Sequence, residues 1–85
     1  MNWQIKISNI VRKNLKKFPE KDKEKIKTAL EEMIFNPYSG DVEKMKDEMN
    51  SWRRRVGSYR IFFDINKEEK IISVTYIKRR TSNTY

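Results

Sequence analysis

The sequence contains no cysteine, no histidine and no long apolar run. Without cysteine the chain has no disulfide and no thiolate chemistry, which fits an intracellular protein. Without histidine it lacks the commonest general base and the commonest metal ligand, and we expect neither a metal nor a cofactor. No apolar segment approaches the ~18 residues of a membrane span, and no signal peptide opens the chain. We therefore expect a cytoplasmic protein with no membrane partner.

The length of 85 residues predicts a single domain, residues 1–85, with one small core. A chain this short rarely encloses a deep substrate cavity, so a shallow surface site is expected. Charge is unevenly spread within the net +8. Residues 1–50 carry eleven Lys or Arg against nine Asp or Glu, whereas residues 51–85 carry nine against three. The basic second half indicates a polyanionic partner such as nucleic acid, an acidic membrane surface or an acidic protein.

The first half of the chain predicts one strand and two helices. Apolar residues alternate in Trp3, Ile5 and Ile7, which is typical of a short strand. Helical spacing then extends over residues 8–18 and 19–36, with Ser8 or Asn9 as the first cap. The apolar stripes are Val11, Leu15 and Phe18 in the first helix, and Ile26, Leu30, Met33 and Ile34 in the second. The two helices are expected to form an antiparallel hairpin.

The second half predicts strands at residues 51–56, 59–65 and 71–77. Residues 38–50 between the helices and these strands are polar and irregular, with a short turn around Val42 and Met45. The order β-α-α-β-β-β is typical of an α+β fold. We expect an antiparallel β-sheet of about four strands, with the N-terminal two-helix hairpin packed on one face and the other face free for function.

The stretch "SWRRRVGSYR", residues 51–60, predicts the register of one hairpin. Gly57 and Ser58 suit a two-residue type II′ turn, which places Val56 opposite Tyr59. Counting outward, Arg55 lies opposite Arg60, and directly opposed residues share a sheet face. The face away from the helices then carries Arg53, Arg55, Arg60 and Phe62, and it is called the arginine face below. The opposite, helix-covered face carries Trp52, Arg54, Val56, Tyr59, Ile61, Phe63 and Ile65.

Two side chains are harder to place from this pattern. Arg54 falls on the helix-covered face, and its apolar stem is expected to be buried while its charged head reaches water at the sheet edge. In the last strand, successive residues point to opposite faces, and each alternating set is called a parity here. The more apolar parity is Ile72, Val74 and Tyr76, which should face the core. The remaining parity, expected on the arginine face, is Ile71, Ser73, Thr75, Ile77 and then Arg79.

Three cations beside an aromatic ring suit the binding of phosphates and a stacked base. Like charges placed directly opposite, such as Arg55 and Arg60, destabilise a strand pair. A fold that needed only solubility could have placed a glutamate at one of these positions. The alternative interpretation is a solvated basic face without a site, or an edge-strand guard against aggregation.

The "WRRRVGSYRIFFDI" segment, followed by a strand and "IKRRTSNTY", resembles the RelE/ParE superfamily of bacterial and archaeal toxins. The likeness covers nearly the whole chain, including a "KMK" segment at 44–46. It implies the RelE-like fold and the activity of RelE-type members, which enter the ribosomal A site and cleave mRNA there. It also implies a cognate antitoxin, the ribosome and mRNA as partners.

The resemblance implies roles for individual residues. Arg53 and Arg55 resemble the two basic positions of the family's second strand, and Arg60 resembles the arginine that closes its V-G-x-Y-R element. Arg79 and Tyr85 resemble the arginine and the tyrosine of the basic tail. The candidate catalytic residues are Arg60, Arg79, Tyr85, Arg53 and Arg55. The candidate RNA-binding residues are Arg53, Arg55, Phe62, Lys78, Arg80 and Lys46.

Cleavage through the 2′-hydroxyl needs a proton acceptor, stabilisation of the phosphorane and protonation of the 5′ oxygen. Arginine is effectively never deprotonated, so it can stabilise the phosphorane but cannot act as the base. Tyr85 is the candidate for proton transfer or for stacking against a base, and Lys78 and Lys46 are reserve bases. The alternatives are a ParE-like inhibitor of DNA gyrase and a non-catalytic RNA-binding module.

Overall fold

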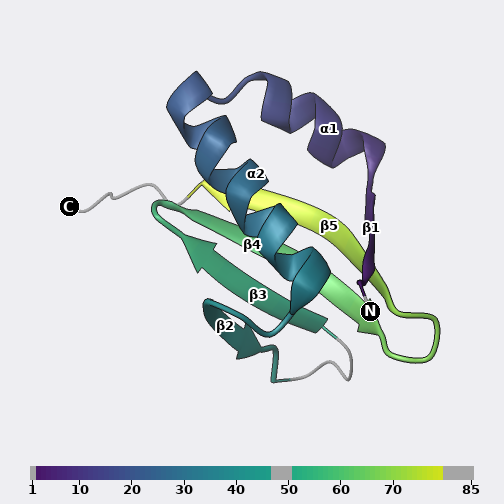
Figure 1. The fold of residues 1–85 in the computed structure, drawn as a ribbon. Helices are drawn as coiled ribbons and strands as arrows, with labels where there is room; N and C mark the ends of the chain where they lie inside the picture. The colour runs from purple at the N-terminus through teal and green to yellow at the C-terminus, as the bar shows by residue number, and fades with distance from the viewer. Residues whose placement is uncertain (1, 47–50, 80–85) are drawn as a thin grey trace.

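The computed structural model describes residues 2–46 and 51–79. Within them the chain forms two helices packed on one face of a five-stranded sheet (Figure 1). The elements in chain order are β1 (Gln4–Ile7), α1 (Asn9–Lys16), α2 (Glu20–Phe35), β2 (Asp41–Lys44), β3 (Ser51–Val56), β4 (Tyr59–Asn66) and β5 (Ile71–Arg79). The expected α+β class, with helices on one sheet face, is confirmed.

The sheet differs from the expected one at both of its edges. Its strand order is β1-β5-β4-β3-β2, and β1 pairs with β5 in parallel, so the sheet is mixed rather than wholly antiparallel. The prediction of an irregular segment at 38–50 was wrong for Asp41–Lys44, which forms strand β2 antiparallel to β3. A four-residue polar edge strand with one half-buried side chain, Val42, leaves almost no apolar alternation to detect.

Local sequence accounts for the helix boundaries. The Ser8 hydroxyl caps α1 by accepting a hydrogen bond from the Val11 amide at 3.3 Å. Pro19 precedes the first turn of α2, where Glu20 and Asp22 face the positive end of the helix dipole. Asn36 ends α2 in an extended conformation, which is the conformation favoured before Pro37. Phe18 lies beyond the end of α1, yet it still packs against the core.

The core lies between the helices and the sheet. Helix α1 packs over β5, and α2 lies over β1 and β3 (Figure 1). The buried apolar side chains are Val11, Ile26, Ala29, Met33, Tyr59, Ile61, Phe63, Ile65, Ile72, Val74 and Ile77. Among the described residues no helix is long and apolar enough to cross a membrane.

The predicted β3–β4 hairpin is confirmed residue by residue. Val56 pairs with Tyr59 and Arg55 pairs with Arg60. Gly57 has a φ of 59°, while Ser58 is not among the residues of positive φ, as a type II′ turn requires. This turn fixes the register and therefore fixes which arginines share a face.

The predicted parity of β5 holds only for its first half. Phe63 pairs with Val74 but Phe62 pairs with Tyr76, so Thr75 is an extra residue in a β-bulge. Beyond the bulge the two faces exchange. Ile77 is buried at 3% exposure, whereas Tyr76 is 45% exposed, which is the reverse of the prediction for both residues. The sequence "IISVTYIKR" alternates acceptably in either parity, so nothing in it signals the bulge.

The expectation that Arg54 extends its head into water was wrong. Its side chain is 9% exposed, and its guanidinium forms an ion pair with Glu32 of α2. The same guanidinium donates to the Ala29 carbonyl oxygen at 3.3 Å and to the Ser39 hydroxyl at 3.5 Å. The segment between α2 and β2 covers the head, so the edge that appeared open in the sequence is closed.

Candidate functional site

The arginine face is formed as predicted on β3 and β4. Arg53, Arg55, Arg60 and Phe62 pair across the two strands with one another and share the face away from the helices. The bulge in β5 then adds a residue that the parity prediction had placed elsewhere. Lys78 pairs directly with Arg60, so it is the β5 cation on this face. The site therefore gains a lysine next to Arg60.

The prediction that Arg79 lies on the arginine face was wrong. Arg79 pairs with Tyr59, whose side chain is buried on the helix-covered side of the sheet. The Arg79 guanidinium lies over the Tyr59 ring, with its carbon 5.8 Å from the ring centroid. A cation over an aromatic face is attracted by the ring quadrupole. The physical reason for the change is the extra residue, Thr75, which shifts every later side chain of β5 to the opposite face.

Two carboxylates of β2 reach the arginine face, and the sequence reasoning missed both. The Arg53 guanidinium donates to Glu43 through two of its nitrogens, one of them Nε at 3.0 Å. The Arg55 Nε donates to Asp41 Oδ2 at 3.0 Å. A signal was present in the sequence, because acidic residues at 41 and 43 have the same two-residue spacing as the arginines at 53 and 55.

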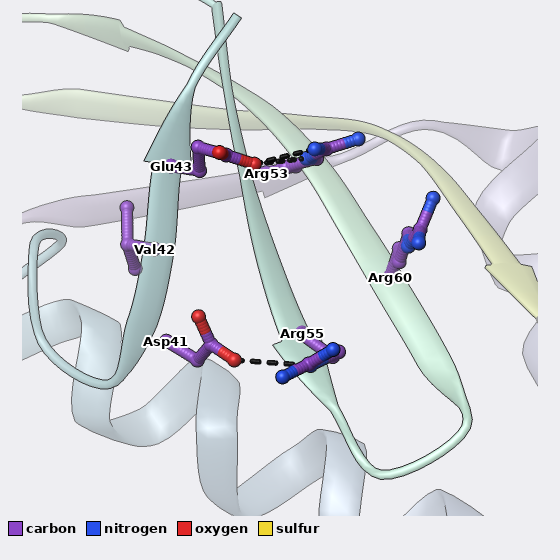
Figure 2. Close-up of a pocket in the computed structure, with 6 residues that line it drawn as sticks. All are labelled: Asp41, Val42, Glu43, Arg53, Arg55 and Arg60. Atoms are coloured by element: carbon purple, nitrogen blue, oxygen red, sulfur yellow. Dashed lines mark hydrogen bonds and ion pairs between the residues drawn. The ribbon is translucent and has the colours of Figure 1, made fainter.

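These side chains surround a shallow hollow of about 320 Å³ (Figure 2). Its lining is Asp41, Val42, Glu43, Arg53, Arg55 and Arg60. Figure 2 shows the two ion pairs spanning β2 and β3, while Arg60 on β4 stands apart from both. Within residues 2–46 and 51–79, no hydrogen bond or ion pair engages the Arg60 guanidinium, which is half-buried and so partly reachable from solvent. Among the residues that the structure describes, Arg60 is thus the cation of the hollow that is free to take an anion.

The cations change the protonation of Glu43. The hydrogen bond from Arg53 and the positive charge of that guanidinium lower the pKa of the Glu43 carboxyl below its usual value of 4.5, with a smaller contribution from Arg60. Glu43 is consequently a carboxylate throughout the neutral range. A carboxylate held within a group of arginines can orient a guanidinium or accept a proton.

Aromatic side chains lie next to the cations on the same face. Phe62, the predicted stacking residue, is half-buried and its ring centroid lies 6.1 Å from that of Tyr76. Tyr76 was expected in the core, but the bulge leaves it on the open face. Its ring offers a stacking surface that the sequence reasoning did not assign.

The remaining predicted residues are not gathered into the hollow. Lys46 is exposed in the turn after β2 and does not line the hollow. Arg80 and Tyr85 lie outside the described residues, so their predicted roles rest on the sequence alone.

Residues 5–83 match the family described as the ParE toxin of the type II toxin–antitoxin system parDE. The chain belongs to this toxin family. It is also similar to a protein of Methanocaldococcus jannaschii that carries the name RelE1, with 28% identity over 94% of this chain and 92% of the relative. The toxin is therefore RelE-like within the RelE/ParE superfamily, as the sequence resemblance predicted.

Solved structures confirm the fold of the toxin. The archaeal RelE of the RelE–RelB complex from Pyrococcus horikoshii superposes with a TM-score of 0.84 at 25% identity, covering 94% of this chain and 97% of that one. The isolated RelE toxin of E. coli superposes with a TM-score of 0.82 at 14% identity, covering 95% of this chain and 87% of that one. The second likeness concerns the fold alone.

Proposed function

We propose that this toxin is a ribosome-dependent endoribonuclease that cleaves mRNA in the ribosomal A site, in the cytoplasm, and so inhibits translation. The observation that carries the proposal is Arg60, a guanidinium without a protein partner among the described residues, fixed on β4 beside a cationic hollow. RelE-named relatives in sequence and in structure support the same assignment.

Arg60 stabilises the charge that develops on the phosphorane. A guanidinium presents planar donors that match two nonbridging oxygens, and it remains charged at every working pH. The tight turn at Gly57 and the pairs with Arg55 and Lys78 hold the Arg60 backbone in place.

Proton transfer falls to other groups. The structure adds Glu43 to Lys46, Lys78 and Tyr85 as a candidate acceptor for the 2′-hydroxyl proton, because it is ionised at neutral pH and lines the same hollow as Arg60. Arg53 holds the Glu43 carboxylate in position through its hydrogen bonds. Tyr85 remains the candidate for protonating the leaving oxygen or for stacking on a base.

Single-turnover cleavage of mRNA on programmed ribosomes tests the proposal. Arg60→Ala should slow cleavage by about 10²–10³-fold, as expected for the loss of a donor to a developing oxyanion. Arg12→Ala, which removes an exposed arginine from helix α1, is the matched control and should cleave normally. Tyr85→Phe tests proton transfer while preserving stacking. Normal cleavage by Arg60→Ala would refute the proposed site.

The pH dependence of the same reaction distinguishes the acceptors. If Glu43 accepts the proton, the rate is level across neutral pH and falls in acid, because the pKa of this carboxyl lies below 4.5. A lysine acceptor makes the rate rise toward pH ~10, where an ordinary ammonium loses its proton. Glu43→Gln should remove the acid limb of the profile together with most of the activity.

A cognate antitoxin neutralises the toxin in this proposal. Solved relatives include RelE–RelB complexes, and the arginine face offers an acidic partner an obvious target. We expect the antitoxin to cover this face with acidic or apolar segments, or to displace Tyr85. Complex formation should weaken as salt is raised, since screening reduces attraction between exposed charges. Binding that ignored ionic strength and left the arginines open would contradict this mode of neutralisation.

Inhibition of DNA gyrase is the second candidate, favoured by the ParE description of the matching family. The two activities differ in readout. Toe-printing on translating ribosomes detects a cleaved or blocked mRNA, whereas a supercoiling assay detects poisoned gyrase. Loss of supercoiling activity with intact mRNA would replace the nuclease assignment by this one.

A further inference from the structure

We propose that strand β2 divides the cations of the arginine face, which is the open face of the sheet, into two classes. One class contacts RNA phosphates and the other does not. Arg60 and Lys78 form the phosphate-contacting pair. Arg53 and Arg55 are neutralised within the protein by Glu43 and Asp41, and they serve to position those carboxylates. The inference rests on the proposed function in taking RNA as the ligand, but it concerns binding and not cleavage.

The pairing pattern sets the two classes. Strand β2 places Asp41 directly opposite Arg55 and Glu43 directly opposite Arg53. On the other side of β3, Lys78 of β5 lies directly opposite Arg60 of β4. Within the described part of the chain neither Lys78 nor Arg60 has a carboxylate partner, so their charges stand side by side uncompensated.

The ion pairs with Asp41 and Glu43 change how strongly each cation attracts a phosphate. Directly opposed like charges destabilise a strand pair, and a phosphate held between Arg60 and Lys78 relieves that repulsion. A phosphate that approached Arg53 or Arg55 would have to compete with a carboxylate that is already paired with the guanidinium. The attraction left for RNA at those two arginines is correspondingly small.

Figure 2 shows the same division in space. The carboxylates of Asp41 and Glu43 extend from β2 toward the arginines of β3, and dashed contacts join each pair. The Arg60 side chain rises from β4, further from β2, without a contact to either carboxylate. Arg53 and Arg55 are thus already engaged, whereas Arg60 has no partner within residues 2–46 and 51–79.

The salt dependence of RNA affinity counts the cations that contact phosphates. For single strands the slope of log K against log salt changes by about 0.7 for each phosphate neutralised. The probe is a fluorescein-labelled oligouridylate, its binding followed by fluorescence anisotropy over a series of salt concentrations, with the full-length purified toxin. No ribosome and no cleavage enter this measurement.

Four single variants and one control give the expected pattern. Arg60→Ala and Lys78→Ala should each reduce the magnitude of the slope by about 0.7, whereas Arg53→Ala and Arg55→Ala should leave it unchanged. Arg12→Ala, on the helical side of the protein, should also leave it unchanged. A loss of slope in Arg55→Ala as large as that in Arg60→Ala would overturn the inference.

Removing one carboxylate supplies the decisive comparison. Asp41→Asn keeps the shape of the side chain and frees Arg55, so the slope should steepen by about 0.7 and affinity at low salt should rise. Adding Arg55→Ala to Asp41→Asn should abolish that gain. No gain in Asp41→Asn would overturn the inference. It would also be overturned if the toxin bound the oligouridylate no better than it binds an uncharged control oligomer.

The outcome is independent of the catalytic assignment. If the slopes follow this pattern while programmed ribosomes are not cleaved, the division of charges stands and the nuclease proposal fails. If cleavage depends on Arg60 but Arg53 and Arg55 contribute to the slope as strongly as Arg60, the nuclease proposal stands and the division by β2 is wrong.

Discussion

Arg54 and its neighbours Arg53 and Arg55 show how differently one residue type is used on the two faces of a single sheet. All three are in strand β3 and all three form an ion pair. The Arg54 side chain is 9% exposed and bridges the sheet to helix α2, while the Arg55 side chain is 56% exposed and pairs with an equally accessible carboxylate. Three identical neighbours therefore divide into one structural residue and two residues of a surface site.

The difference teaches that position relative to the pleat, rather than charge, sets the role of each arginine. Successive side chains of a strand point to opposite faces, so a run of three cannot act as one cluster. Exposed ion pairs contribute little to stability because water and salt compete with them. A buried guanidinium with several acceptors costs much more to remove, since its partners lose their donor and its volume is left empty.

The largest expected effect separates Arg54 from Arg55. Arg54→Ala should lower the free energy of unfolding by about 3 kcal/mol, at the low end of the range for a broken buried pair because Glu32 keeps access to water. Arg55→Ala should change it by less than about 1 kcal/mol, as is usual for an exposed pair. Urea unfolding of both variants measures the difference. Equal losses would show that the two arginines do not differ in the way the structure indicates.

Arg54→Met refines the interpretation of that loss. A methionine fills part of the volume without a charge, and replacement of a buried ion pair by an apolar residue of similar size is often tolerated. If Arg54→Met is as unstable as Arg54→Ala, the hydrogen bonds to Glu32 and to the Ala29 carbonyl carry the stability. If stability is largely restored, packing carries it.

A smaller effect tests the segment that closes over Arg54. Gly40 and Gly57 both have positive φ, at 79° and 59°, so either substitution by alanine strains the backbone. A Cβ at Gly40 would lie 2.8 Å from the buried Arg54 guanidinium, whereas one at Gly57 would meet nothing within 4 Å. Gly40→Ala should therefore cost about 1–2 kcal/mol more than Gly57→Ala, from overpacking alone. Thermal unfolding of the pair measures this difference, and equal costs would contradict the close approach.

Much of this arrangement could be predicted from the sequence because local rules determine it. The Gly57-Ser58 turn sets the pairing of Arg55 with Arg60, and strand alternation then assigns every residue from 51 to 65 to a face. The surface placement of Arg53, Arg55 and Arg60 followed from about fifteen contiguous residues, whereas the resemblance to a toxin family drew on nearly the whole chain.

The features that sequence reasoning missed depend on contacts between distant segments. Because of the bulge at Thr75, Lys78 instead of Arg79 lies on the open face, and both registers satisfy the local pattern equally well. Strand β2 is too short and too polar to be recognised from an apolar pattern, and it is held by pairing with β3 residues eight to fourteen positions away. The buried head of Arg54 needs a cover from the α2–β2 segment, which no local pattern specifies.

The smallest expected effects concern pH, and the two faces should respond in opposite ranges. On the helix-covered side, Tyr59 donates to Asp22 at 2.7 Å. Burial, and then the hydrogen bond and charge of Asp22, raise the pKa of the Tyr59 phenol above its usual 10.0. On the open face, Arg53 lowers the pKa of the Glu43 carboxyl below 4.5.

The signs follow from which protonation state the folded protein prefers. The folded protein binds the Tyr59 proton more tightly than the unfolded chain does, so this stabilisation is complete below pH 10.0 and is lost as pH rises through the folded pKa. For Glu43 the stabilisation is present above pH 4.5 and is lost as pH falls through the folded pKa. Urea unfolding over a range of pH should therefore show an alkaline decline from the helix-covered side and an acid decline from the open face.

Matched variants assign each decline to its face. Tyr59→Phe should remove part of the alkaline decline and leave the acid one, and Glu43→Gln should do the reverse. The Glu43 contribution should also shrink in high salt, because the pair with Arg53 is accessible to ions, whereas the Tyr59 contribution should persist because Tyr59 is a buried residue. If both declines proved equally sensitive to salt, the contrast between a closed and an open face of this sheet would not describe its electrostatics.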